Sequence, residues 1–242
     1  MSGARDRLLA PRHPHGVNGA WGYRTPAIVG LAAFAMPVAV VLVGLGACTE
    51  SPLLPTLSDY VHHARAGLAF MVPLWIVGLF LLVAYRGHTL LDALLSLLAG
   101  AGAIMAAVFQ VAMELCITDR GPWADRLVVR ELHYAGAIAL FVSAWAFCRC
   151  SFPRCLVRAR TPGASWRRTL FLRCARVIAV SAVLLGVAFG FEDALGIEGL
   201  PVIALLETVM LFAFGTAWLV HAGLTGNFLD ELRYGTERSG EG

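Results

Sequence analysis

Several polar side chains that could take part in chemistry lie at the ends of apolar segments. These ends are predicted to lie on the same side of the protein. Ser58 and His62 stand four residues apart, so they share one face if an α-helix begins at Ser58. His133 opens another apolar segment, and Glu207 lies inside the last one, about seven residues or roughly 10 Å from its predicted outer end. These positions define an outer polar cluster, which consists of Ser58, Tyr60, His62, Arg65, Glu114, His133 and Glu207.

Three kinds of role fit these residue types. Imidazoles and carboxylates bind Zn²⁺ and act as general acids or bases, so His62, His133 and Glu207 are the candidate metal ligands. Alternatively, Arg65 and Arg130 form buried ion pairs with Glu207 that fix helix register, and His133 donates a capping or interfacial hydrogen bond. The third role is a pocket for a polar ligand, because ionisable groups in a membrane span are costly unless they serve a purpose. No cofactor is predicted.

The elements that must position this cluster are apolar segments long enough to cross a bilayer. Of the 242 residues, 58% are hydrophobic and only 14% charged, whereas a soluble domain carries about 25% charged residues. Six apolar runs come close to the roughly 20 residues that a transmembrane helix needs. They predict spans at about 27–47, 66–85, 93–113, 132–152, 172–191 and 200–222. The expected fold class is therefore all-α, a polytopic transmembrane bundle of six helices.

The arginines predict how this bundle is oriented. All 19 basic residues are arginine, and alternation through six spans places 15 of them on one side. Because arginine-rich loops stay in the cytoplasm, the bundle is expected N-in and C-in. Residues 1–26 are then a disordered cytoplasmic tail, and residues 223–242 form a second cytoplasmic tail. The absence of lysine, with abundant alanine and glycine, indicates a GC-rich bacterial genome and hence a multi-pass protein of the bacterial cytoplasmic (inner) membrane.

The cysteines divide between the two predicted faces. Cys48 and Cys116 end the first and third spans on the outer face, where a disulfide is chemically allowed. Two unpaired cysteines at the membrane boundary are the equal alternative. The remaining four surround the arginine-rich inner loop with a spacing that is not typical of zinc sites; they are Cys148, Cys150, Cys155 and Cys174.

One span carries a run of small residues. The segment LLAGAGAIMAA at 97–107 consists mostly of glycine and alanine. Small side chains allow two membrane helices to approach closely, so this run predicts tight packing within the bundle.

Four stretches are similar to a family of bacterial six-span membrane proteins that has no established activity. PTLSDYVHHARAGLAFMVPLWIVGLFLLVAYRG resembles the family's entry into its second span, which ends at a Tyr-Arg-Gly turn. LHYAGAIALFVSAWAF, RCARVIAVSAVLL and LLETVMLFAFGTAWLVHAG resemble its fourth, fifth and sixth spans. The resemblance covers about residues 50–225 and implies that Tyr60, Arg65, His133 and Glu207 are characteristic positions. The family faintly resembles the Frag/DRAM/Sfk-like six-span proteins, some of which are linked to lipid or GPI-anchor handling.

Three functions from different classes stay open. The first, which we adopt, is an integral inner-membrane protein that binds membrane lipids or another membrane protein through the outer polar cluster, with no nucleic-acid partner. The second is an outer-leaflet, membrane-embedded hydrolase, with or without a metal. The spacing of Ser58 and His62 resembles that of alkaline ceramidases and adiponectin-receptor-like hydrolases, but the last span has no H-x-x-x-H. The third is a small transporter, which needs a polar path through the bundle.

Overall fold

Six helices in the structure are long and apolar enough to cross a membrane. The computed structural model describes residues 21–47, 53–62, 64–85, 89–109, 126–159, 164–197 and 199–223, and within these ranges the chain contains helices and no strand. The expected all-α, six-span architecture is confirmed. The apolar spans are Pro26–Leu45, Arg65–Ala84, Leu90–Val108, Glu131–Leu156, Ser165–Gly190 and Val202–His221.

The helices follow one another around a ring. Each long helix packs on the next in the chain, and the last closes the ring on the first. The seam between the fourth and fifth long helices is the most loosely packed. In chain order the elements are α2 (Trp21–Ala47), α3 (Ala64–Leu79) with the π-helical turn η2 (Phe80–Ala84), α4 (Leu90–Val108), α5 (Arg126–Ala146) with the π-helical turn η3 (Phe147–Ser151) and α6 (Phe152–Ala159), α7 (Ala164–Gly190), the short α8 (Glu192–Leu195) and α9 (Val202–His221).

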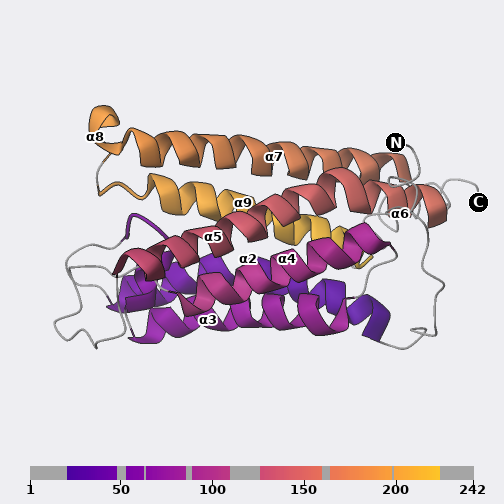
Figure 1. Ribbon diagram of the computed structural model, residues 1–242, viewed down its shortest axis with the longest axis horizontal. Helices are drawn as coiled ribbons and strands as arrows, with labels where there is room; N and C mark the ends of the chain where they lie inside the picture. The colour runs from indigo at the N-terminus through magenta and orange to yellow at the C-terminus, as the bar shows by residue number, and fades with distance from the viewer. Residues whose placement is uncertain are drawn as a thin grey trace, which may run out of the picture.

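The bundle has two chemically different ends. The first is the plug end, named for the segment 53–62, which lies between α2 and α3 and is called the plug from here on. The second is the arginine end, which carries Arg149, Arg154, Arg167, Arg168 and Arg173. Figure 1 shows that α2 begins and α9 ends near α6, at the arginine end. Six crossings therefore bring both ends of the described chain to one side, and which side of the membrane that is stays a prediction.

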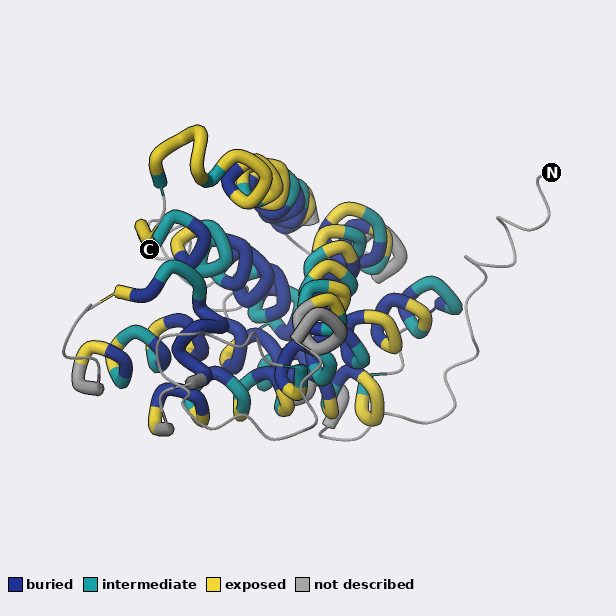
Figure 2. Tube along the Cα trace, turned by 60° about the vertical axis from the view of Figure 1, so that its left-hand side comes forward, coloured by how far each residue is buried: buried dark blue, intermediate teal, exposed yellow. Residues whose placement is uncertain are grey.

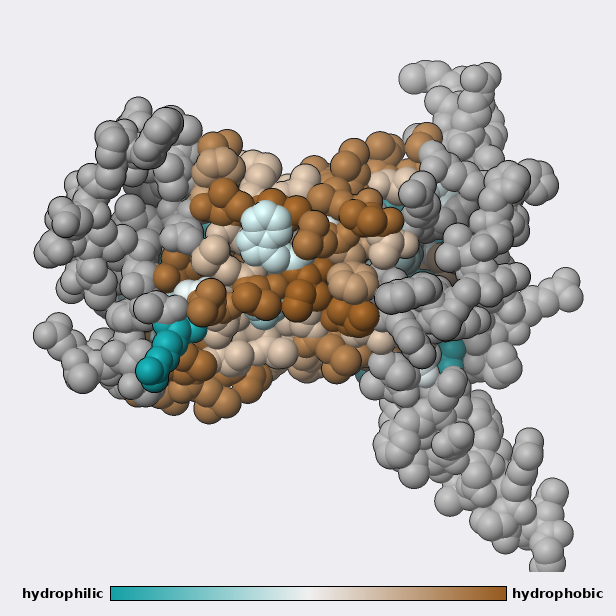
Figure 3. All heavy atoms as spheres, turned by 90° about the horizontal axis from the view of Figure 1, so that it is seen from below, coloured by the Kyte–Doolittle hydropathy of each residue, from teal (hydrophilic) through white to brown (hydrophobic). Residues whose placement is uncertain are grey.

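The surface between these ends is apolar, as a lipid environment requires. Figure 3 shows a band of hydrophobic residues across the middle of one face. Large apolar side chains point outward on every span, and α7 exposes the greatest share of its length (Figure 2). Because apolar surface of this extent is not stable in water, the protein is a multi-pass integral membrane protein.

Glycines bring three pairs of helices into close contact. Gly30 of α2 faces Gly215 of α9, so a Cβ on Gly215 would lie 2.9 Å from the Gly30 carbonyl oxygen. Likewise, a Cβ on Gly100 would lie 2.9 Å from the carbonyl oxygen of Gly78, and one on Gly136 would lie 2.8 Å from that of Gly102. The small-residue run at 97–107 therefore packs α4 tightly against both neighbours, because nothing larger than hydrogen fits between the backbones.

The arginine end is closed by aromatic and capping contacts. Thr89 and Asp92 form a reciprocal capping box that starts α4, and Ser151 donates to the second Asp92 oxygen at 2.5 Å. The Trp218 ring is fully buried and packs edge-on against Tyr85 with centroids 5.0 Å apart. Burial raises the pKa of Tyr85 well above its ordinary value, so this phenol keeps its proton. These contacts hold the end of η2, α4, η3 and α9 together at the arginine end of the bundle.

Replacing Gly136 with alanine should destabilise the bundle. The added methyl group would lie 2.7 Å from the Ala106 backbone nitrogen, so the α4 and α5 backbones must separate, and overpacking of this kind costs about 1–3 kcal/mol. Thermal unfolding in detergent measures the effect. Gly190→Ala is the matched control, because a Cβ there meets nothing within 4 Å. Equal melting temperatures for the two variants would contradict the close α4–α5 contact.

Candidate functional site

The plug is an irregular segment that supplies its own hydrogen-bond partners. The Thr56 hydroxyl accepts from the Asp59 backbone N–H at 3.1 Å, and the Asp59 carboxylate accepts from the Thr56 N–H at 3.0 Å. This reciprocal pair is a capping box, and it starts the 3-10 helix η1 (Ser58–His62). Because η1 is a 3-10 helix with about three residues per turn, the α-helical spacing expected from Ser58 onward does not apply here.

Helix α9 holds the plug in place through two hydrogen bonds. The Ala204 N–H, one of the donors left free at the start of α9, reaches the Pro55 carbonyl at 2.9 Å. One carboxylate oxygen of Glu207, Oε2, accepts from the Leu57 N–H at 2.8 Å. Glu207 lies about 8 Å along the helix from the start of α9. A carboxylate inside the span therefore satisfies a backbone donor of a loop that would otherwise be unpaired at this depth.

Tyr60 fixes the other side of the plug. Its ring is 1% exposed and fills the space left by Gly44 of α2, while its hydroxyl accepts from the Leu54 N–H at 3.1 Å. Both ends of this side chain are thus used within the protein. Tyr60 belongs to the scaffold that positions Ser58, and it does not line the cleft described below.

His133 links α5 to the end of α4. Its ring is 4% exposed, and Nδ1 lies 2.9 Å from the Ala106 carbonyl oxygen, which can only accept. Nδ1 therefore carries the proton and donates to one of the carbonyls left unpaired in the last turn of α4. This is the capping contact considered from the sequence, made between two helices.

A cleft of about 700 Å³ opens along the loose seam between α5 and α7, with α9 as its floor. This volume lies within the range of small-molecule pockets in proteins, about 300–1,000 Å³. Toward the arginine end, Phe152 contacts Phe171, with ring centroids 5.2 Å apart. At the plug end, Tyr134 contacts Phe189, with ring centroids 5.6 Å apart. The seam is therefore bridged at both ends and open between them.

The walls of the cleft combine large and small side chains. From α5 come Tyr134, Ala137, Ile138, Phe141, Val142 and Trp145. From α7 come Ile178, Ala179, Ala182, Leu185, Gly186 and Phe189. The small residues of α7 stand opposite the bulky stripe of α5 and so create the space. Ile138 and Val142 are 63% and 51% exposed, so the cleft opens sideways, toward the lipid.

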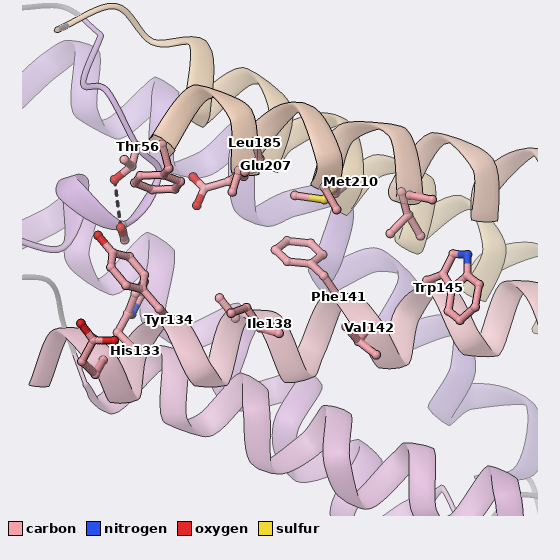
Figure 4. A pocket seen from close by; sticks show the side chains of 18 residues that line it. Thr56, His133, Tyr134, Ile138, Phe141, Val142, Trp145, Leu185, Glu207 and Met210 are labelled. Atoms are coloured by element: carbon pink, nitrogen blue, oxygen red, sulfur yellow. Dashed lines mark hydrogen bonds between the residues drawn. The ribbon is translucent and has the colours of Figure 1, made fainter. Parts of the chain in front are cut away.

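The ionisable and hydroxyl groups of the cleft are all at its plug end. Figure 4 shows Thr56, His133, Tyr134 and Glu207 at one end and Trp145 at the other. Ser58 and Glu131 complete the polar end. A second cavity, about 30 Å³ in size, lies deeper in the bundle beside Ser58, His133 and Glu207. It is large enough for a water molecule.

The structure brings only part of the outer polar cluster together. Ser58, His133 and Glu207 meet at the cleft, whereas Arg65 is exposed and makes no ion pair with Glu207 among the described side chains. Glu114 and the proposed Cys48–Cys116 disulfide lie outside the described residues, as do the side chains of His62 and Arg130.

The described side chains do not supply the set of ligands that the metal-site hypothesis needs. Where side chains are described, no three of His, Cys, Asp or Glu are grouped closely enough to hold an ion. The combination of His62, His133 and Glu207 stays a prediction, because the His62 side chain is not described. Cys148 and Cys174 are buried, Cys150 and Cys155 are partly exposed, and none of these four is in a disulfide.

Sequence reasoning missed Thr56, Glu131, Tyr134 and the apolar walls. Thr56 has a recognisable signal, because Thr-x-x-Asp at 56–59 is a capping-box pattern. Tyr134 begins a stripe with Ile138, Phe141 and Trp145 at helical spacing. That stripe alone does not reveal a cleft, since a helix face that contacts lipid has the same pattern.

Replacing Glu207 with alanine should free the plug. The Leu57 N–H then loses its acceptor, and an unsatisfied buried donor costs about 1–3 kcal/mol. Hydrogen exchange should show protection of the Leu57 amide falling by about tenfold to a hundredfold. Glu207→Gln should retain protection, because an amide oxygen still accepts this bond. Unchanged exchange in Glu207→Ala would rule out the tether.

Comparisons with known proteins leave the function to be argued from this site. No family model, no curated protein and no solved structure gives a significant match to the chain. The resemblance to bacterial six-span proteins therefore stays an expectation from the sequence, and the chain is assigned to no family.

Proposed function

We propose that the protein binds a membrane lipid, with an acyl chain in the α5–α7 cleft and the head at the plug end. The observation that carries this proposal is the amphipathic cleft itself, which is open to the side and has its ionisable and hydroxyl groups at one end only. A soluble polar ligand has no partner along the apolar walls. A lipid matches both parts at once.

The dimensions of the cleft support the same occupant. From His133 to Trp145 the cleft follows α5 for roughly 18 Å at 1.5 Å per residue. One leaflet contributes about half of the 30 Å hydrocarbon core, or about 15 Å. A chain with its head near His133 would therefore extend to about the bilayer midplane and would reach the level of Trp145.

The arginine distribution assigns a leaflet within this proposal. If the arginine end faces the cytoplasm, as arginine-rich segments do, the plug end faces outward. The bound lipid then belongs to the outer leaflet of the bacterial inner membrane. The same placement puts Glu207 and the plug near the headgroups of that leaflet.

The contacts of the polar residues favour binding over hydrolysis. The Ser58 hydroxyl pairs with the Thr56 hydroxyl at 2.9 Å, and His133 Nδ1 is held by Ala106. A serine nucleophile needs a base within hydrogen-bonding reach, and no described hydrogen bond joins Ser58 to His133. Transport is also less favoured, because the buried ionisable side chains described lie toward the two ends of the bundle, as Asp59 and Asp92 do.

Filling the cleft should remove the bound lipid. Gly186 lines the cleft, and a Cβ added there meets nothing within 4 Å, so Gly186→Leu places its side chain in the space for the acyl chain. Steric crowding of about 1–3 kcal/mol should weaken lipid binding about tenfold. Native mass spectrometry of the detergent-purified protein measures the lipid that remains bound.

Gly190→Leu is the matched control on the same helix. A Cβ at Gly190 also meets nothing within 4 Å, but this residue does not line the cleft. Both variants replace helical glycine with a better helix former, so neither should unfold α7. Equal lipid retention in the two variants would refute the cleft as the binding site.

A further inference from the structure

The apolar walls of the cleft give little selectivity among membrane lipids. Lipid tails solvate leucine or phenylalanine about as well as another protein surface does, so burying a chain between helices yields no large hydrophobic gain. Selectivity must therefore come from the polar end. Its charged members among the described residues that line the cleft are Glu131 and Glu207, both acids, and no arginine is among them.

Glu207 is placed to receive a hydrogen-bond donor from the cleft. Its Oε2 atom is used by the Leu57 N–H, and its carboxylate points into the cleft in Figure 4. No described side chain forms an ion pair with it. A carboxylate held in a membrane span without a cation is costly, and a ligand that carries the cation offsets this cost.

The plug places a second acid near Glu207. Asp59, 6% exposed, lies close enough to interact with Glu207 and uses one oxygen to cap the plug. The hydroxyls of Thr56 and Ser58 are bonded to each other and supply no charge. An anionic head placed against these groups would be repelled. An ammonium would be attracted and could donate to the carboxylate.

We infer that the cleft selects a lipid whose head carries a primary ammonium, which Glu207 binds. This inference rests on the proposed function and adds the chemical class of the lipid. The ammonium donates to the Glu207 oxygen that faces the cleft, and the acyl chain lies along the stripe from Ile138 to Trp145. In a site that excludes much of the water, such a charge-assisted bond is stronger than at a surface.

Two lipids with identical acyl chains test the inference. Delipidated protein in detergent is titrated with phosphatidylethanolamine, which has an ammonium, or phosphatidylglycerol, which has none, and native mass spectrometry gives each dissociation constant. The wild-type protein should bind phosphatidylethanolamine about tenfold more tightly, as expected for a hydrogen bond to a charged group. Glu207→Gln should bring the two constants within about threefold of one another, because it keeps the bond to Leu57 and removes the charge.

Glu192→Gln is the control, since it removes a carboxylate near the plug end that does not line the cleft. It should keep the tenfold preference. A wild-type protein that binds phosphatidylglycerol as tightly as phosphatidylethanolamine overturns the inference, as does a preference that survives Glu207→Gln. If Gly186→Leu still weakens the binding of both lipids in those cases, the cleft is retained as the lipid-binding site and only the selectivity for an ammonium head is rejected. If Gly186→Leu changes neither, the cleft itself fails.

Discussion

The hydrogen bond from the Leu57 N–H to Glu207 connects a loop, a helix and a cavity in one contact. Without it, the irregular plug would carry an unpaired backbone N–H at the depth of Glu207, inside the span formed by α9. Lipid offers no hydrogen-bond partner at that depth. With it, and with the bond from Ala204 to Pro55, the plug is held against α9. Ser58 and Thr56 consequently stand at the mouth of the cleft, and the Glu207 carboxylate stays at its polar end.

The ring of helices is tight on one side and loose on the other. Paired glycines let α2, α3, α4, α5 and α9 approach at backbone distance, whereas α7 packs more loosely against α5. Aromatic contacts bridge α7 to α5 at one end of the seam and to α6 at the other. Rigid packing around most of the ring thus fixes the position of α5. The gap beside α7 follows from small residues on α7 facing large ones on α5. A cavity between two spans is a natural site for a lipid chain, since the chain enters sideways without leaving the bilayer.

Several residues of this site form hydrogen bonds to backbone groups of the protein and also line the cleft. His133 donates a hydrogen bond to the last turn of α4 and also lines the cleft. Thr56 caps the start of η1 in the plug and also lines the cleft. A polar group in a membrane protein is costly, so a side chain that satisfies a backbone partner and also faces a ligand serves two needs at once. This double use means that a loss of function after replacing His133 does not by itself identify a ligand contact. Gly186 is more informative, because it has no partner to lose.

The sequence by itself determined the number of spans, the all-helical class and the tight packing of the glycine run, because these depend on local composition and spacing. It also contained the Thr-x-x-Asp pattern of the plug, which becomes meaningful once Thr56 is seen to cap η1. Only the tertiary structure decided that Ser58, His133 and Glu207 meet while Arg65 and Tyr60 do not line the cleft. The partner of Glu207 is 150 positions away in the chain, and the cleft is a gap between helices that a helical stripe cannot distinguish from a lipid-facing surface. Contacts between distant segments depend on how the helices pack. The spacing of residue types within one helix does not reveal that packing.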